Sequence, residues 1–238
     1  MLSDLWIPRR ELIKPKRFLP GWHPGHIGAG GDNATPLTLS FRSSSLSTGE
    51  TITAPSDIVS GDVIFLLDRA LAGKVSPSEV IAAGFTSISS IGGSGSGTNS
   101  RQIVSYKIAD GSEASANITG MLGSSQNKII AVFQGDSAIG SVSIQSIAGE
   151  TTPDNPASQA VTSAGGTPAL IVFGCYGSNG AISPRTWTGG TATELNSADN
   201  ETWLNYEIFN TSPANITVDM DDEGGVNFLQ SFYAECSA

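Results

Sequence analysis

Gly61-Asp62-Val63-Ile64-Phe65-Leu66-Leu67 is the most informative segment of the chain, because its pattern returns further along as Pro168-Ala169-Leu170-Ile171-Val172-Phe173. Within these stretches, residues 63–67 and 169–173 are continuously apolar, which is typical of a strand buried on both faces. Residues 61–135 and 168–234 follow the same order of elements, although most side chains differ between them. The duplication therefore predicts a strand framework that is used twice rather than a duplicated catalytic site.

Two further pairs of segments carry the repeat. The segment Val104-Ser105-Tyr106-Lys107-Ile108 corresponds to Leu204-Asn205-Tyr206-Glu207-Ile208, and Ala116-Asn117-Ile118-Thr119 recurs unchanged at residues 214–217. Alternate residues of a strand share a face, so the apolar residues of the first pair predict a core face in each copy. Each copy closes on an apolar run, at residues 129–133 and 228–233.

The composition indicates an all-β protein. The chain has 238 residues, of which 39% are apolar and 14% are charged. A chain of this length can bury a sizeable core, and its Gly, Ser and Thr content suits short strands joined by tight turns. We therefore expect a jelly-roll-like antiparallel β-sandwich in one domain, residues 34–238, built from two pseudo-repeats of about residues 36–135 and 141–238.

Residues 1–33 differ from the rest of the chain. Four prolines between residues 8 and 24 exclude a long helix, and the apolar residues among them have no period. Residues 28–33 are rich in Gly and have the composition of a hinge. We expect an extended N-terminal arm that binds another chain. Its candidate partner-binding residues are Trp6, Ile7, Arg9, Arg10, Lys14, Lys16, Arg17, Phe18 and Trp22.

Charge is distributed unevenly. Residues 1–17 hold five basic and two acidic groups, whereas the remaining residues hold seven basic and twenty acidic groups within a total of −10. An acidic body repels phosphate backbones, so we expect no nucleic-acid partner. The chain has no apolar run of membrane-spanning length and no secretory signal pattern, so we expect synthesis in the cytoplasm and no membrane partner.

The remaining elements follow from local patterns. Residues 37–41 and 142–147 alternate apolar with polar side chains and predict strands with one wet face. Ser76-Pro77-Ser78-Glu79 has the form of a helix capping box and predicts a short helix that continues to residue 83 and ends at Gly84. The Gly/Ser-rich stretches at residues 92–100 and 151–166 predict loops.

Cys175 and Cys236 lie in the apolar strands that open and close the second copy. We interpret them as small buried apolar residues. A disulfide is the alternative, and a reducing cytosol disfavours it.

Catalytic chemistry has little support in the sequence. The two histidines, His23 and His26, both lie in the arm, so a Ser-His-Asp triad in the body is excluded. A pair of carboxylates for glycoside hydrolysis is not excluded, but no pair stands out. We assign no catalytic residue and no cofactor.

Two further segments are weak candidates for binding sites. Asp219, Asp221, Asp222 and Glu223 crowd one turn and form a weak calcium candidate, although their spacing does not match an EF-hand loop. Trp187 and Trp203 are possible glycan-binding residues, but aromatic residues at repeat-equivalent strand positions more often belong to the core.

Several segments of the first copy resemble a known class of protein. The Gly61-Asp62 start of the first strand, the Gly84-Phe85-Thr86 turn, residues 104–113 and the closing Val132-Phe133-Gln134-Gly135 are similar to the repeated sandwich units of tailed-phage and prophage structural proteins. The resemblance covers about residues 36–238 and is looser in the second copy, where Trp187-Thr188-Gly189-Gly190 replaces the turn. It implies a jelly-roll-like subunit that coats or extends a virion, with no catalytic residues to transfer.

We therefore expect a non-enzymatic virion protein, either a capsid decoration protein or a head or tail fibre subunit. The arm would attach it to a major capsid or tail protein, and the protein would form homo-oligomers, with a trimer as one expected state. The alternative is a carbohydrate-binding module that is located on a virion or cell surface and recognises receptor glycans. An esterase or glycosidase is disfavoured by the missing histidines.

Overall fold

The computed structural model describes residues 37–70, 80–95, 98–120, 126–151, 157–161, 169–178, 187–188, 191–197, 201–210, 216–220 and 226–238. These residues form antiparallel strands and turns, and none of them is helical. The predicted all-β sandwich is thereby confirmed. The arm at residues 1–33 lies outside the described residues and stays a prediction.

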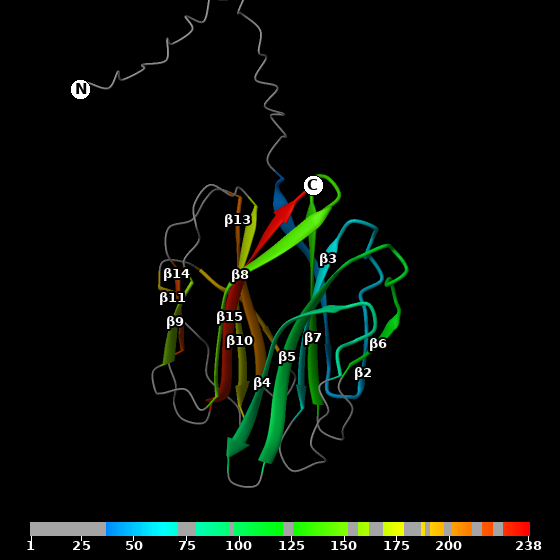
Figure 1. Cartoon of the computed structure of the whole chain (residues 1–238). Coiled ribbons are helices and arrows are strands. Elements are labelled where there is room, and N and C mark those ends of the chain that lie inside the picture. The colour runs from blue at the N-terminus through cyan, green and yellow to red at the C-terminus, as the bar shows by residue number, and fades with distance from the viewer. Residues whose placement is uncertain are drawn as a thin grey trace, which may run out of the picture. The chain divides into compact units, whose positions relative to one another are not determined.

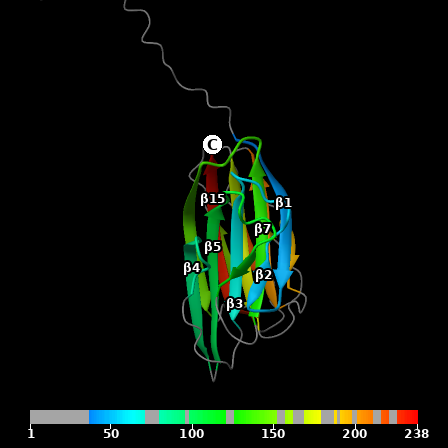
Figure 2. The same cartoon turned by 90° about the vertical axis from the view of Figure 1, so that its right-hand side faces the viewer.

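Residues 39–135 form one large and one small sheet. The large sheet has the order β1-β7-β3-β5-β4 and the small sheet pairs β2 with β6. Figure 2 shows the large sheet in face view, with β2 in front of it. The strand bounds are β1 Leu39–Ser47, β2 Thr51–Thr53, β3 Val63–Ala70, β4 Thr86–Gly95, β5 Thr98–Ile108, β6 Asn117–Thr119 and β7 Gln126–Gly135.

Residues 141–237 form a second large sheet and a second small sheet. Their orders are β12-β13-β10-β15-β8 and β11-β14-β9. The small sheets lie on opposite flanks of the two large ones (Figure 1). The strand bounds are β8 Ser141–Thr151, β9 Ala157–Val161, β10 Leu170–Ser178, β11 Trp187–Thr188, β12 Thr193–Asn196, β13 Thr202–Phe209, β14 Ile216–Met220 and β15 Val226–Ser237.

Strand pairing within each half is nested. In the first half β1 pairs with β7, β2 with β6 and β3 with β5, and in the second half β8 pairs with β15, β9 with β14 and β10 with β13. Nested antiparallel pairs arise when a long hairpin is rolled up, which is the construction of a jelly roll. The chain completes one rolled unit before it begins the other.

The two halves correspond strand by strand. If β3 is matched to β10, β5 to β13 and β7 to β15, the order of the first large sheet reproduces that of the second, read in reverse. The register agrees, because Phe65 lies opposite Tyr106 as Phe173 lies opposite Tyr206. The duplicated framework predicted from the sequence is therefore present in the fold.

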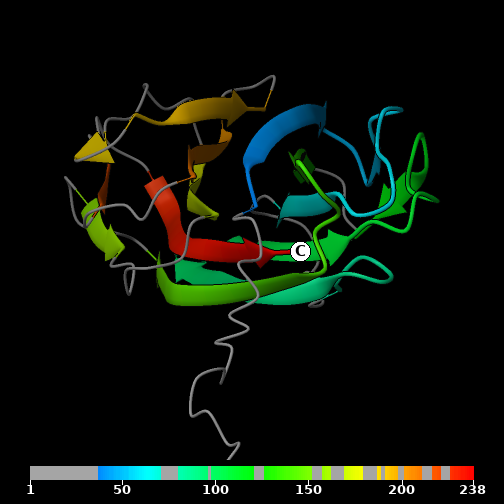
Figure 3. The ribbon, with the colours of Figure 1, turned by 90° about the horizontal axis from the view of Figure 1, so that it is seen from above.

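The large sheets pack face to face, as the view of the ribbon from above shows (Figure 3). The core between them is rich in aromatic residues. The equivalent residues Phe65 and Phe173 meet at its centre, with ring centroids 4.4 Å apart. Phe133 and Phe232 surround them at centroid distances of 4.8–6.2 Å. All four rings are fully buried, and removal of such a ring typically costs about 3–5 kcal/mol.

Each small sheet covers the outer face of its own large sheet. In the first half, Ile52 of β2 and Ile118 of β6 pack over Ile64, Leu66 and neighbouring residues of the large sheet. In the second half the outer face carries a cluster of Leu170, Val172, Tyr176, Trp203, Leu229 and Tyr233. Covering on both faces explains why the central strands are continuously apolar.

Three local predictions require correction. Residues 80–82 have no regular structure and residues 83–84 form a turn, so the predicted helix does not continue there, and its capping box lies outside the described residues. Residues 92–95 and 98–100, predicted as loop, are the paired ends of β4 and β5. Residues 157–161, also predicted as loop, form β9 because they pair with β14.

Both cysteines are free and buried in the central core. Burial raises the pKa of the Cys175 thiol and raises that of Cys236 to about 12, since a thiolate is poorly solvated there. The interpretation of these residues as small apolar side chains is therefore supported.

Candidate functional site

A cavity of about 350 Å³ opens beside the small sheet of the first half. It lies between β5, the turn that precedes β4 and the turn that leads into β6, so segments distant in sequence form its walls. Its volume is at the lower end of the range of small-molecule sites. It is lined by Ala83, Phe85, Lys107, Ser112, Glu113, Ala116, Asn117, Ile118 and Thr119.

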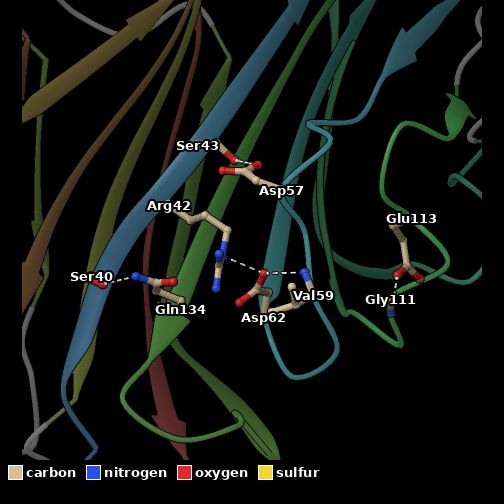
Figure 4. A network of polar contacts seen from close by, with 9 residues as sticks. All are labelled: Ser40, Arg42, Ser43, Asp57, Val59, Asp62, Gly111, Glu113 and Gln134. Atoms are coloured by element: carbon tan, nitrogen blue, oxygen red, sulfur yellow. Dashed lines mark hydrogen bonds and ion pairs between the residues drawn. The ribbon is translucent and has the colours of Figure 1, made fainter.

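The charged groups of this cavity are tied to each other. Lys107 of β5 forms an ion pair with Oε1 of Glu113, and its Nζ lies 3.7 Å from Oδ2 of Asp110. Oε2 of Glu113 accepts hydrogen bonds from the backbone N–H groups of Asp110 (3.2 Å) and Gly111 (3.1 Å). Figure 4 shows the Glu113 side chain directed at Gly111. Glu113 is 5% exposed, so its carboxylate acts as the buried anchor of this turn.

The electrostatics of the cavity keep Lys107 charged. Its hydrogen bond to Glu113 raises the pKa of Lys107 against the opposing effect of burial. Hydrogen bonds from Ser112 lower the pKa of Asp110. A lysine that is held as an ammonium ion can bind an anionic or hydroxyl group but is a poor nucleophile. The arrangement therefore suits binding or structural support rather than covalent catalysis.

A second set of polar contacts joins β1 to the loop at residues 55–62 (Figure 4). Nε of Arg42 lies 2.8 Å from Oδ2 of Asp62, and the backbone N–H of Val59 donates to the same oxygen at 2.9 Å. Ser43 donates to Asp57 at 2.6 Å. Gln134 of β7 donates to Ser40 at 3.0 Å. These contacts fix the loop against the sheet.

A third set lies between the large sheets at one end of the core. Arg69 is fully buried and donates to the backbone oxygen of Glu201 (2.8 Å) and to Oγ1 of Thr202 (3.2 Å). Gln102 donates to Oε1 of Gln230 at 2.7 Å. Buried polar groups need such partners, so this network links the two halves at a defined register.

A fourth polar contact lies on the outer face of the first large sheet. Nζ of Lys128 lies 2.5 Å from Oδ1 of Asp68, and both side chains are almost wholly removed from solvent. Burial lowers the pKa of Lys128, while the charges of Asp68 and Glu50 oppose this effect.

None of these four polar sites was predicted from the sequence. The charged residues Asp68 and Arg69 directly follow the apolar run at 63–67 in the same strand. Their position next to buried residues could have predicted that their side chains are buried as well. Lys107 lies in a strand that belongs to the repeat, which predicted its secondary structure but not its ion pair. No feature of the sequence predicted that Glu113 is buried.

The residues predicted from sequence are placed as follows. The arm residues lie outside the described part of the chain, as do Asp221, Asp222 and Glu223 of the calcium candidate, whereas Asp219 lies in β14. Within the described residues, no group of three or more His, Cys, Asp or Glu could hold a metal ion. No helix in the described part is long and apolar enough to cross a membrane.

The two tryptophans differ. Trp187 lies in β11. Trp203 is only 5% exposed and packs with Tyr176 and Leu229 in the outer cluster of the second half. The suggestion that Trp203 offers a stacking platform for glycans is therefore corrected. Its side chain lies on the covered outer face of the second large sheet, because alternate residues of β13 face opposite sides and Leu204 faces the central core.

Comparison with known proteins gives no relative. No protein-family model, no curated protein and no solved structure matches the chain.

Proposed function

We propose that the chain is a non-enzymatic structural protein of a virion, either a capsid decoration protein or a head or tail fibre subunit. The observation that carries the proposal is the use of charged side chains within the duplicated sandwich. Arg42, Arg69, Lys107 and Lys128 all make contacts that hold strands, turns or loops together. Groups used in this way support rigidity rather than turnover.

The attachment part of the proposal rests on the sequence. The basic, proline-rich arm at residues 1–33 would bind a major capsid or tail protein, while the acidic sandwich projects from the particle. Further copies of the chain are the second proposed partner. The resemblance of residues 36–238 to phage sandwich units supports the same assignment.

The test is to locate the protein in particles. Particles released by the source cells would be separated on a density gradient, and the fractions would be analysed by mass spectrometry. We expect the chain to co-sediment with the major capsid or tail protein at a fixed stoichiometry. A chain found only in the soluble fraction would contradict the proposal.

The arm is tested in the same assay. A variant in which Arg9, Arg10, Lys14, Lys16 and Arg17 are replaced by Gln keeps the length and apolar residues of the arm. We expect its occupancy on particles to fall, and to fall further at high salt, because screening weakens exposed charge contacts. Replacement of Lys74, Arg101 and Arg185 by Gln is the control for loss of positive charge in the body. Equal occupancy of the wild type and the arm variant would refute the proposed role of the arm.

A further inference from the structure

Asp68 and Lys128 form an unusually close pair on adjacent strands. They are direct partners in the antiparallel register of β3 and β7. Nζ of Lys128 lies 2.5 Å from Oδ1 of Asp68, and the two side chains are 0% and 4% exposed. The fold therefore holds an amine and a carboxyl group in contact, out of water.

The backbone at Gly120 closes over this pair. A Cβ atom built on Gly120 would overlap Oδ2 of Asp68 and would lie 3.5 Å from Nζ of Lys128. Gly120 is itself buried. The carboxyl group is thus confined between the sheet and the segment that follows β6.

Burial favours the uncharged forms of both groups. The cost of removing an ion pair from water is avoided when one proton passes from the ammonium to the carboxylate. Burial lowers the pKa of Lys128, which is the direction that this transfer requires. The pair can therefore reach the neutral amine and carboxylic acid, which are the reactive forms for condensation.

The second half of the molecule shows that the framework does not require an ion pair at this place. By register, Tyr176 corresponds to Asp68 and Leu229 to Lys128. These two residues pack in the apolar outer cluster of the second half. Apolar side chains at the same point of the duplicated framework are often as stable as a buried ion pair. The first half thus carries a chemical feature that the architecture alone does not explain.

We propose that Lys128 and Asp68 condense to form an intramolecular isopeptide bond between Nζ and Cγ. The ammonium first gives one proton to the carboxylate. The amine lone pair then attacks Cγ, a C–O bond breaks, and the oxygen leaves as water with a second proton from the nitrogen. The products are one amide and one water molecule, and no oxidant, reductant or further reactant is needed.

The geometry supports this reaction. Oδ1 is bonded directly to Cγ, so the nitrogen lies roughly 3–4 Å from the carbon, close to the separation of about 3–3.5 Å in near-attack arrangements. Holding two groups in this way gives effective concentrations that no free amine reaches. The resulting bond would join β3 to β7 at the centre of the first large sheet and would restrict the unfolded chain as a disulfide does.

The experiment is intact-mass spectrometry of the full-length chain under denaturing and reducing conditions. We expect the wild-type mass to be lower than the sequence mass by one water molecule. A proteolytic digest should contain one branched peptide in which Lys128 is linked to Asp68. The proposal does not depend on the location of the protein, so it can fail while the virion assignment stands.

Three variants complete the test. Lys128→Arg keeps the positive charge but cannot form the amide, and Asp68→Ala removes the carboxyl group, so both should have their full sequence masses. Lys107→Arg changes another paired lysine and should still lack one water. A wild-type mass equal to the sequence mass after prolonged incubation would overturn the proposal. Loss of water that maps to other residues would also overturn it.

Discussion

Gly177 makes room for a buried arginine. It occupies in β10 the register position that Arg69 occupies in β3, since Gly177 lies opposite Thr202 as Arg69 lies opposite Gln102. A Cβ atom on Gly177 would lie 2.6 Å from both Nε of Arg69 and Oε1 of Gln102. The two halves therefore differ at this position in a complementary way: one supplies the side chain and the other supplies the space.

This complementarity leads to a prediction for Gly177→Ala. The added methyl group must displace part of a fully buried polar network, so the free energy of unfolding should fall by about 1–3 kcal/mol. Urea denaturation measures the change. Gly49→Ala is the matched control, because a Cβ there meets its nearest atom at 3.6 Å, and it should stay within about 0.5 kcal/mol of the wild type. Equal effects of the two substitutions would contradict the predicted collision.

The Lys107–Glu113 ion pair predicts a pH dependence. Glu113 raises the pKa of Lys107 above its ordinary value of 10.5 in the folded state. The pair therefore stabilises the fold fully below pH 10.5, and this contribution is lost as the pH rises through the higher folded-state pKa. Glu113→Gln should lower the free energy of unfolding by about 1–2 kcal/mol at neutral pH.

The difference between wild type and Glu113→Gln should narrow as the pH rises beyond 10.5. Urea titrations over a pH series measure it. Lys107→Gln, which lacks the titrating group, should show the same weaker pH dependence as Glu113→Gln. A difference that stays constant through the alkaline range would show that the ion pair does not account for the stabilisation.

Among the elements, β1 is held at its start by a side chain of the other half. Asn210, which follows β13, accepts a hydrogen bond from the backbone N–H of Leu39 (2.7 Å) and donates one to its backbone oxygen (3.0 Å). An amide side chain thus takes the place of a neighbouring strand. This contact ties the first strand of one large sheet to the end of a strand in the other.

We predict that Asn210→Ala loosens this end of β1. Loss of two hydrogen bonds should cost about 1–2 kcal/mol. Hydrogen exchange at the amide of Leu39 should become faster, and mass spectrometry or NMR can measure it. Asn117→Ala is the control, because the Asn117 side chain accepts one exposed hydrogen bond from Thr53 within the small sheet. If Leu39 exchanges at the same rate in both variants, the proposed tie does not hold β1.

The sequence predicted the central strands well because they are covered on both faces. The runs at 63–67, 129–133 and 169–173 are apolar without interruption for that reason, and all three lie within or at the start of large-sheet strands. Prediction failed for the ends of β4 and β5 and for β9. These segments are rich in Gly, Ser or Ala, and their strand structure depends on pairing partners rather than on local preference.

The polar sites were harder to predict. Arg69 and Lys128 are buried because residues distant in the sequence lie over them. Arg69 is covered by residues of the second half, and Lys128 lies near Gly120, so neighbouring residues in the sequence do not reveal the burial of either side chain. The Lys107–Glu113 pair joins a strand to the turn that follows it, so only the path of the chain brings the groups together. Spacing alone could not distinguish these charges from solvated ones.

At the scale of the whole molecule, the two halves share one core. The central cluster contains residues of both large sheets, including Phe65, Phe133, Phe173 and Phe232. Neither large sheet can cover its inner face without the other, and a half on its own would expose these rings to water. Each half therefore has a complete strand topology, but it is not expected to fold stably without the other half.

We predict that residues 37–238 unfold in a single cooperative transition. Near-ultraviolet circular dichroism and the reactivity of the Cys175 and Cys236 thiols should report the same midpoint, because both thiols lie in the shared core. Residues 141–238 expressed alone should lack the dispersed amide signals of a folded protein in NMR spectra. Two separate transitions, or a folded isolated half, would refute this prediction.

The meeting of Phe65 with Phe173 matches the arrangement expected of a two-fold symmetric dimer. Two identical half-length polypeptides associating about a dyad would place the same residue of each on the axis, in contact with its own counterpart. In the present molecule the equivalent residues of the two halves meet in this way, and residues 136–140 join the halves covalently. A covalent connection of this kind removes the entropic penalty of dimerisation and allows the two halves to carry different side chains. Position 69 carries arginine and the equivalent position 177 carries glycine. Two identical chains could not combine these different residues at one pair of equivalent positions.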